Sequence, residues 1–300
     1  QNSVVSIIED KTGFLWFATQ DGLNRYDGKD FFSLPKTFDD KTTSYDRKLG
    51  KIISVSDRAL WLITTNGKLE SFDLFNYQTI PIEILPGTDF VLPKLNTMLR
   101  DSKGDIWLGT ENEGLILFKY SARQARQLKE PVPGNNALRS VNNIYEDAQH
   151  NIWCATGDGL LLYSSDGEFK KHFLSSASAL SPHLSFSCIT QDKAGNIWAG
   201  SFGSGLFVKQ KNTGGFTAFR GLNNFELQSP SLVVEALLAD ENNMLWIGTY
   251  GKGLFVHNIN DSATQQFLNN KANGYSIGFN DVLEIYRDKQ GSIWLGTDGG

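Results

Sequence analysis

The fold is decided by the stretch DSKGDIWLGT, residues 101–110, because similar stretches recur along the whole 300-residue chain. All seven tryptophans lie in such copies, at successive spacings of 45, 46, 46, 45, 48 and 48 residues. They are Trp16, Trp61, Trp107, Trp153, Trp198, Trp246 and Trp294. A period of this length predicts a repeat architecture.

The residues around each tryptophan follow a fixed pattern. The residue before it is Leu or Ile, and the third residue after it is Thr or Ser, in every copy. The second residue after it is Ala or Gly except at Ile63, and Asp stands six residues before it except at Val55. Gly follows that Asp by three residues in four copies, while His150 and Asn243 take its place in two others. This predicts a tight turn, since Asp accepts hydrogen bonds from backbone N–H groups and Gly adopts a positive φ without a Cβ clash.

Each copy predicts a set of short strands. Two strands flank the turn, and the second, as in residues 106–110, is apolar on both faces and must be covered on both. Period-two geometry places the tryptophan and the small residue on one face, so we expect the indole to pack against the next repeat. A third strand begins at a glycine after a polar loop, and a weaker fourth strand follows, as in residues 31–34.

Four antiparallel strands in about 45 residues are typical of a β-propeller blade, so we predict a single all-β propeller. The expected blades are residues 3–46, 47–92, 93–138, 139–183, 184–230 and 231–279, with a partial blade at 280–300. A linear solenoid is the competing interpretation, but it would need shorter units or helices. A propeller must close its ring to hide its sheet edges. We therefore expect these residues to be a fragment of a longer protein, cut before the seventh blade is finished.

Composition excludes several classes of protein. The net charge is −5 with scattered Lys and Arg, so a general electrostatic grip on nucleic acid is not expected. No run of 18 apolar residues that could span a membrane is present, and we expect any export signal to lie outside these residues. Cys154 and Cys188 form no CxxC motif and lie in apolar stretches. Two buried thiols are favoured, and a disulfide between neighbouring strands stays open.

The pattern V-x-x-I-x-x-D-x-x-G-x-[IL]-W-[LIF]-G-T-x-x-G-L resembles the two component regulator propeller repeat. Residues 1–28 are similar to that family's typical first blade, whereas the second copy is the poorest match. The resemblance implies a periplasmic sensor region of a bacterial inner-membrane receptor, which would be a homodimer when complete. It implies a second propeller and a C-terminal β-sandwich as neighbours, and a histidine kinase or, in other members, a diguanylate cyclase as output. Hybrid members sense oligosaccharides, so an oligosaccharide or another small molecule is the ligand that the resemblance implies.

An enzyme is not indicated by the residues. The four histidines, His150, His172, His183 and His257, share neither a metal-ligand spacing nor a repeat position. Ca²⁺ takes six to eight oxygens. Each recurring Asp stands alone in its turn except Asp101, which has Asp105 nearby, so we predict no metal, cofactor or catalytic residue. A propeller hydrolase or lyase, resembling sialidases or streptogramin lyases, remains a remote alternative. A non-catalytic protein-binding propeller is a closer one.

The candidate ligand residues lie in the loops between second and third strands, which we expect on one face of the ring. Exposed loops of this kind often carry binding residues. Sugars require amide or carboxylate hydrogen bonds beside an aromatic platform, which Phe202 and Tyr250 on adjacent blades would supply. The candidates are Asp21, Asn66, Asn112, Asp158, Phe202, Tyr250 and Lys252. Polar residues near the starts of first strands are expected to line the channel and hold water: Asn96, Asn142, Asn143 and Glu235.

Overall fold

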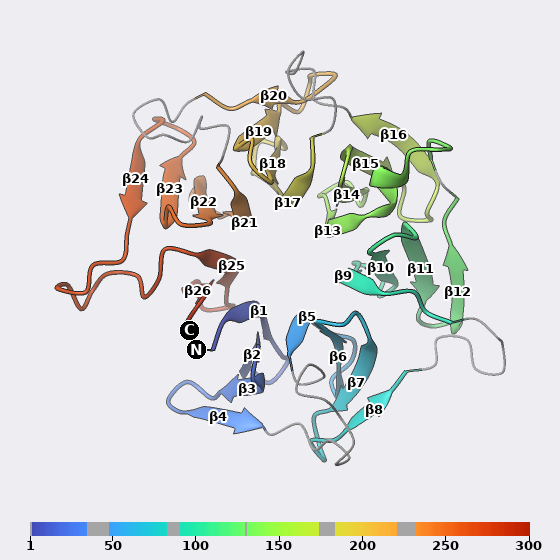
Figure 1. Ribbon diagram of the computed structural model, residues 1–300, viewed down its shortest axis with the longest axis horizontal. Coiled ribbons are helices and arrows are strands. Elements are labelled where there is room, and N and C mark those ends of the chain that lie inside the picture. Colours follow the sequence, from blue (N-terminus) through green and yellow to red (C-terminus); the bar gives the residue numbers. More distant parts are fainter. Residues whose placement is uncertain (1, 35–47, 83–90, 130, 174–183, 221–231) are drawn as a thin grey trace.

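The structure is a computed structural model that describes residues 2–34, 48–82, 91–129, 131–173, 184–220 and 232–300. Small antiparallel sheets surround a central axis like the blades of a propeller (Figure 1). Six sheets have four strands each, and the seventh repeat contributes a two-stranded sheet. The predicted all-β propeller of four-stranded antiparallel blades is confirmed for six blades, and the linear solenoid is excluded. We number the sheets 1 to 7 in chain order.

The strands of each full sheet follow one another along the chain, so every sheet is built from one continuous stretch of sequence. Sheet 1 consists of β1 (Val4–Glu9), β2 (Leu15–Thr19), β3 (Gly22–Tyr26) and β4 (Phe31–Leu34). Sheet 2 consists of β5 (Leu49–Ser54), β6 (Ala59–Thr64), β7 (Leu69–Asp73) and β8 (Thr79–Pro81). Sheet 3 consists of β9 (Leu95–Arg100), β10 (Ile106–Thr110), β11 (Leu115–Lys119) and β12 (Gln124–Gln127).

The remaining sheets repeat this order. Sheet 4 follows the short 3₁₀ helix η2 (Asn136–Arg139) and consists of β13 (Val141–Glu146), β14 (Ile152–Thr156), β15 (Gly159–Tyr163) and β16 (Phe169–Phe173). Sheet 5 consists of β17 (Phe186–Gln191), β18 (Ile197–Ser201), β19 (Leu206–Lys209) and β20 (Thr217–Ala218). Sheet 6 consists of β21 (Val234–Ala239), β22 (Met244–Thr249), β23 (Leu254–Asn258) and β24 (Thr264–Phe267). Sheet 7 consists of β25 (Val282–Arg287) and β26 (Ile293–Thr297).

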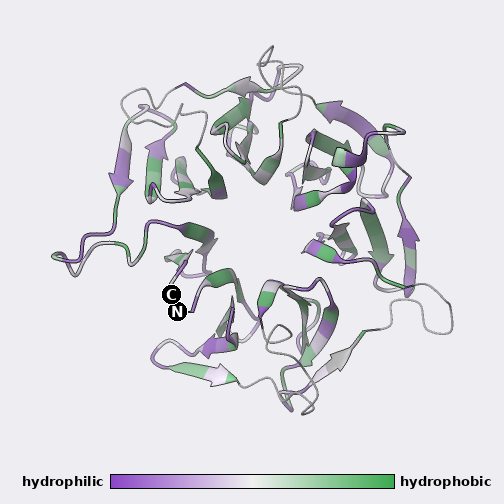
Figure 2. Cartoon of the chain, viewed as in Figure 1, coloured by the Kyte–Doolittle hydropathy of each residue, from purple (hydrophilic) through white to green (hydrophobic). Residues whose placement is uncertain are grey.

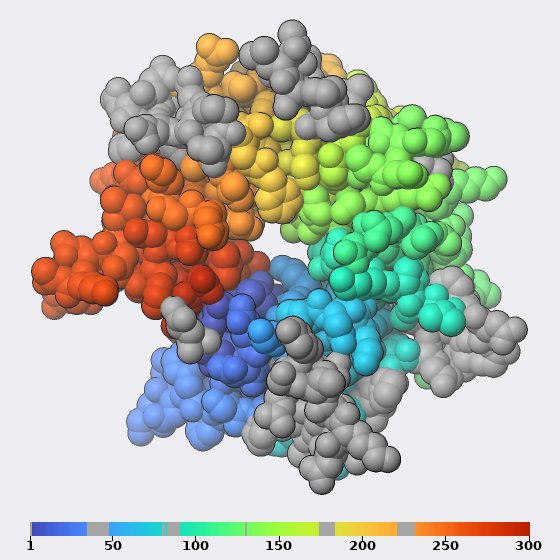
Figure 3. All heavy atoms as spheres, in the orientation of Figure 1, coloured from blue at the N-terminus to red at the C-terminus, as the bar shows by residue number. Residues whose placement is uncertain are grey.

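The first strand of every sheet lies nearest the axis and contacts the first strand of the next sheet (Figure 1). β25 and β26 contact β1, so sheet 7 closes the ring against sheet 1. The space-filling view shows an open channel at the centre (Figure 3). Apolar residues concentrate on the inner strands, whereas the outermost strands β12, β16 and β24 are mainly polar (Figure 2). In the described residues, no helix is both long and apolar enough to cross a membrane.

The tryptophans fill the spaces between neighbouring sheets. Trp16 packs in a cluster with Leu49 and Leu60 of sheet 2, although it belongs to sheet 1. The same arrangement closes the ring, because the Trp294 ring of sheet 7 lies 5.8 Å from Phe17 of sheet 1. Each indole thus joins its own sheet to the following one, and the junction between the last and first sheets is built like the others.

A second role of the recurring Asp appears only in the structure. In six repeats its Oδ2 accepts a hydrogen bond from the indole Nε1 of the same repeat, at 2.7–3.0 Å. Its Oδ1 accepts backbone N–H groups of the turn, as Asp101 does from Lys103 and Asp105. Burial opposes ionisation of Asp288, but the bonds from Trp294 and the turn hold the pKa of that carboxyl below its usual value. The Asp therefore fixes both the turn and the orientation of the indole.

Both cysteines are buried free thiols, which confirms the favoured interpretation over a disulfide. Burial raises the pKa of the Cys188 thiol to about 12. Burial also raises the pKa of the Cys154 thiol. Neither thiol is therefore ionised near neutral pH, and both pack as small apolar side chains.

The small residue two positions after the tryptophan, present in every repeat except at Ile63, allows the next sheet to approach closely. At Gly200 an added Cβ would lie 2.6 Å from both the Val234 Cγ1 and the Cys188 Sγ. We expect Gly200→Ala to lower the free energy of unfolding by about 1–3 kcal/mol, because the core is overpacked there. Chemical denaturation measures this. The control is Gly214→Ala, since that site has open space and is expected to be neutral. Equal stability of both variants would contradict the close approach.

Candidate functional site

The loops between second and third strands lie on one face of the ring together with the connections between sheets. The backbone N–H of Tyr250 in such a loop donates to the carbonyl of Val233, which leads into the first strand of its own sheet. The N–H of Gly203 donates to Leu232, which leads into the first strand of the next sheet. Each of these loops thus bridges two connections. We call this side the loop face. The opposite side, which carries the first–second and third–fourth turns, is the turn face.

Phe202 and Tyr250 lie beside the same segment of the loop face. Phe202 forms an isolated β-bridge with Val233, and the carbonyl of Val233 accepts the N–H of Tyr250 at 3.1 Å. The two side chains are 46% and 62% exposed. The backbone therefore brings two solvent-facing aromatic residues from adjacent sheets to the same segment of the loop face.

The other five predicted residues divide into two groups. Asp21, Asn112 and Lys252 are exposed, on sheets 1, 3 and 6. Asn66 accepts hydrogen bonds from the Thr64 hydroxyl and the Lys68 N–H, so it stabilises its own loop. Asp158 is buried and its Oδ2 accepts from Asn135 Nδ2 at 2.6 Å, which ties the loop to the connection before sheet 4. Four cavities are well defined among the described residues, and none of the seven predicted residues lines any of them.

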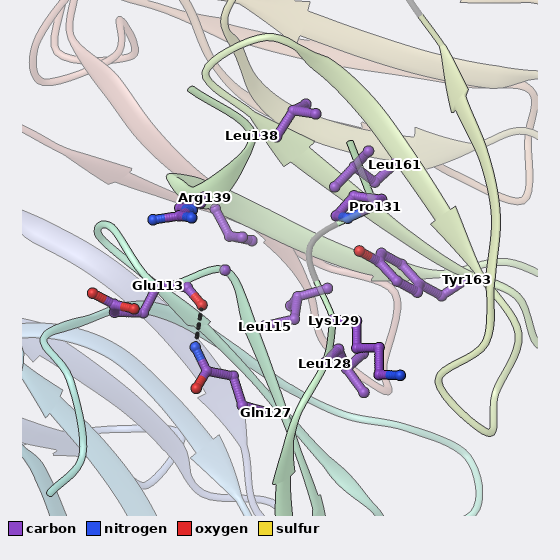
Figure 4. A pocket seen from close by; sticks show the side chains of 12 residues that line it. Glu113, Leu115, Gln127, Leu128, Lys129, Pro131, Leu138, Arg139, Leu161 and Tyr163 are labelled. Atoms are coloured by element: carbon purple, nitrogen blue, oxygen red, sulfur yellow. Dashed lines mark hydrogen bonds between the residues drawn. The ribbon is translucent and has the colours of Figure 1, made fainter. Parts of the chain in front are cut away.

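One of these cavities lies between sheets 3 and 4 on the loop face, with a volume of about 130 Å³ (Figure 4). Its walls combine apolar side chains with charged and amide side chains. Figure 4 shows Leu115, Leu138 and Leu161 around it, with the Tyr163 hydroxyl directed towards Pro131. Burial raises the pKa of Tyr163. Its volume lies well below the range of about 300–1,000 Å³ that is typical of small-molecule sites, so the cavity is too small to hold an oligosaccharide.

Polar residues of the channel tie neighbouring first strands together. Asn96 Nδ2 donates to the Val141 carbonyl at 3.4 Å, and Asn142 Nδ2 donates to the Phe186 carbonyl at 2.8 Å. Glu235 holds the equivalent position in sheet 6, where burial and the nearby charge of Asp281 raise its pKa. The two asparagines therefore join neighbouring sheets, and their predicted contact with channel water stays a prediction. The signal in the sequence was one repeat position that is polar in four successive repeats: Asn96, Asn142, Ser187 and Glu235.

A polar cluster on the turn face has the residue types of a catalytic triad but not the geometry. Ser102 Oγ and Glu146 Oε1 both lie 2.9 Å from the same nitrogen of His150, Nδ1, and Ser102 Oγ donates to that same Glu146 oxygen at 2.6 Å. A triad uses the two ring nitrogens for different partners. Partial burial opposes ionisation of Glu146, but the hydrogen bonds from Ser102 and His150 hold the pKa of its carboxyl below the usual value. The cluster joins sheets 3 and 4.

This contact belongs to a recurring device, which we call the turn latch. The last residue of a first strand accepts, through its side chain, the backbone N–H that follows the turn Asp of the preceding sheet. Glu146 accepts from Ser102 at 2.7 Å and Gln191 from Ala148 at 2.8 Å. Glu9 of sheet 1 accepts from Lys289 of sheet 7 at 2.8 Å. The turn latch therefore also acts at ring closure. Sequence reasoning missed it because it joins residues more than forty positions apart.

The remaining candidates for chemistry are metal ligands and the four histidines. Among them, no three His, Cys, Asp or Glu side chains gather to hold a metal ion. His150 lies in a turn, His172 on the outermost strand β16 and His257 on the third strand β23, so none of the three belongs to a channel-lining first strand. His183 lies outside the described residues.

Comparison with known proteins supports the family resemblance. The family described as two component regulator propeller matches residues 1–21, 180–203 and 276–299, which contain Trp16, Trp198 and Trp294. The resemblance seen in the sequence is thereby confirmed at the first, fifth and seventh repeats. No curated protein sequence matches the chain.

Solved structures share the whole ring. The extracellular domain of a proposed one component system from B. thetaiotaomicron has a TM-score of 0.79 at 24% identity, covering 99% of this chain and 38% of its own. The extracellular domain of a proposed hybrid two component system from the same organism has a TM-score of 0.78 at 22% sequence identity. That match covers 99% of this chain and 39% of the other. This chain thus spans less than two fifths of either relative. Virginiamycin B lyase from Staphylococcus aureus has a TM-score of 0.71 at 15% sequence identity, and the match covers 98% of this chain and 92% of the lyase. At these identities, the likeness shows the fold.

Proposed function

We propose that this chain, which carries two component regulator propeller repeats, is the extracytoplasmic sensor propeller of a bacterial signalling receptor. One observation carries the proposal: the repeats match that family, and 99% of the chain overlays extracellular domains of proposed signalling systems. The segment works by binding and not by catalysis. A histidine kinase is the output we favour over a diguanylate cyclase, because one of those relatives is described as a hybrid two component system.

Signalling by such a propeller requires that a ligand bind one arrangement of the receptor better than another. We place the periplasmic ring in a homodimer, beside a second propeller or a β-sandwich of the same protein. The inter-sheet bonds described above support this picture, since a ring tied at its channel and turn face would move as one body. The ligand would then shift the orientation of whole rings.

The ligand of the loop face is, in this proposal, an oligosaccharide held against Phe202 and Tyr250. A ligand present at about 100 times its Kd stabilises the folded state by ~2.7 kcal/mol. We therefore expect at least one glycan in a panel to raise the melting temperature of the chain by a few degrees. Differential scanning fluorimetry measures this.

The variants that test this site are Phe202→Ala and Tyr250→Ala. Both side chains are largely exposed, so the variants should fold normally and lose the shift. The control is Tyr275→Ala, whose side chain is fully exposed and lies outside this site. Failure of every glycan to raise the melting temperature would remove the sugar from the proposal.

Reading the gene beyond the codon for Gly300 tests the receptor itself. A transmembrane segment followed by kinase motifs is the expected result. A stop codon soon after one closing blade would overturn the receptor and favour the protein-binding propeller. The lyase alternative has less support, because the likeness to virginiamycin B lyase is one of fold and the described histidines lie off the first strands.

A further inference from the structure

A cleft on the turn face, between sheets 1 and 2, plays no part in the loop-face proposal. Its volume is about 350 Å³, within the range of small-molecule sites. Its walls are the first–second turns of both sheets, the third–fourth turn of sheet 2 and Arg25 of β3. Sheet 2 is the copy that lacks the usual turn Asp, and its Asp57 pairs instead with Lys11 of sheet 1. We call this cavity the Arg25 cleft.

The Arg25 guanidinium is held in place by aromatic rings but has few hydrogen bonds. Its Cζ lies 4.6 Å from the ring centre of Phe14 and 5.2 Å from that of Phe32. Its Nη1 donates to the Tyr77 hydroxyl at 2.7 Å, whereas its Nε is buried and has no acceptor. A guanidinium carries five N–H donors. Most of those of Arg25 are therefore unused, on a group whose plane is already fixed.

Among the cations around the cleft, Arg25 is the one that forms no ion pair with a described carboxylate. Lys11 pairs with Asp57, and Arg58 pairs with Asp73 at 3.0 Å. Asp10 is buried, and its two oxygens already accept the Trp16 indole and the turn N–H and hydroxyl groups. Within the described residues, Arg25 has no carboxylate at ion-pair distance. An incoming anion would therefore find a guanidinium that is in no ion pair and has unused donors in a planar fork.

The third–fourth turn of sheet 2 presents aromatic surface to the same cleft. Phe75 is 85% exposed and Tyr77 is 39% exposed. The turn is firmly built, because Asp73 Oδ1 accepts the N–H of Phe75 at 2.8 Å and the carbonyl of Asp73 accepts the N–H of Tyr77 at 2.9 Å. Tyr77 is held at φ 59°, which non-glycine residues rarely adopt. Exposed rings on a rigid turn form a ready platform for a flat or ring-shaped ligand.

We propose that the Arg25 cleft binds an organic carboxylate attached to a six-membered ring. The carboxylate would take two parallel hydrogen bonds from the Arg25 fork, the geometry in which guanidinium groups recognise carboxylates. The ring would lie against Phe75 and Tyr77. A uronate-containing oligosaccharide and an aromatic acid share this chemistry, and the volume of the cleft suits either.

Isothermal titration calorimetry on the whole 300-residue chain tests the proposal with digalacturonate, its methyl ester and phenylacetate as probes. We expect at least one acid to bind saturably and the ester not to bind. Binding by digalacturonate alone identifies a sugar acid, and binding by phenylacetate alone identifies an aromatic acid. Equal binding of acid and ester, or binding of neither acid, would overturn the proposal.

The matched variants locate the site. Arg25→Lys keeps the charge but loses the planar fork, so the affinity should fall by about tenfold or more. Phe75→Ala should weaken binding about threefold to tenfold, and its folding is safe because the ring is largely exposed. Tyr275→Ala should bind as the unaltered chain does. Unchanged affinity in Phe75→Ala and in a folded Arg25→Lys would overturn the proposal. So would loss of acid binding in Tyr250→Ala, which would move the acid to the loop face. A rise in melting temperature that a glycan causes and that Tyr250→Ala abolishes tests the loop-face site of the proposed function, and it does not decide whether the Arg25 cleft binds an acid.

Discussion

Replacing Trp107 with alanine is expected to lower the free energy of unfolding by about 3–5 kcal/mol. The indole is fully buried and packs with Leu138 of η2 and with Val141 and Ile144 of sheet 4. Its Nε1 also donates to Asp101 at 2.8 Å. Alanine would leave a cavity between two sheets and a buried carboxylate without its donor. Denaturant titration followed by fluorescence of the remaining tryptophans gives the value.

The control for this variant is Phe75→Ala, which removes an aromatic ring of which 85% is exposed. Its cost should be within about 0.5 kcal/mol, as for other exposed positions. A Trp107→Ala chain as stable as this control would show that the indoles do not hold the sheets together.

Asp147→Asn is expected to cost about 2–4 kcal/mol, although the side chain keeps its shape. The carboxylate accepts four groups: the N–H of Gln149 and of Asn151, the Asn151 amide and the Trp153 indole at 2.8 Å. A carboxamide has one oxygen, so either the indole or the turn must face an NH₂ group. One buried donor then loses its acceptor whichever way the amide is oriented. Thermal and chemical denaturation measure the loss.

A spectroscopic measurement separates this cause from general destabilisation. The indole N–H resonance of Trp153 should shift in Asp147→Asn, while those of the other repeats stay in place. Asp57→Asn is the control, because Asp57 is exposed and bonds to no indole. An unchanged Trp153 resonance would contradict the bond between carboxylate and indole.

The sequence predicted the ring because its decisive information is periodic. The spacing of Trp107 and Gly109 places an indole and a gap on one face of a strand, and only a neighbouring sheet can fill such a face. Repetition of that face then requires sheets on both sides. The loop between strands was equally readable for Phe202 and Tyr250, which lie beside one backbone segment. The hydrogen bonds of Asn66 within its loop and of Asp158 to Asn135 could not be predicted in this way, because a short polar side chain can bond to its own loop or to a neighbouring connection. Ligand binding at all four residues stays a prediction.

Contacts between repeats could not be read from the chain. The six-residue interval between Asp and Trp was visible, but the hydrogen bond across it depends on the twist of the hairpin. Arg25 meets Tyr77 across 52 positions, and no glycine announces the left-handed backbone at Tyr77. The Arg25 cleft thus depends on contacts that occur in one repeat alone, whereas the prediction from sequence rested on residues that recur in every repeat.

Within the described residues, each sheet draws its strands from one continuous stretch of the chain. Trp294 and the latch between Glu9 and Lys289 join sheet 7 to sheet 1 through the same kinds of contact used elsewhere in the ring. A gene duplication or deletion of one whole repeat would therefore leave the hydrogen bonding of every sheet intact. Propellers of this construction can change their number of modules during evolution at the cost of curvature alone.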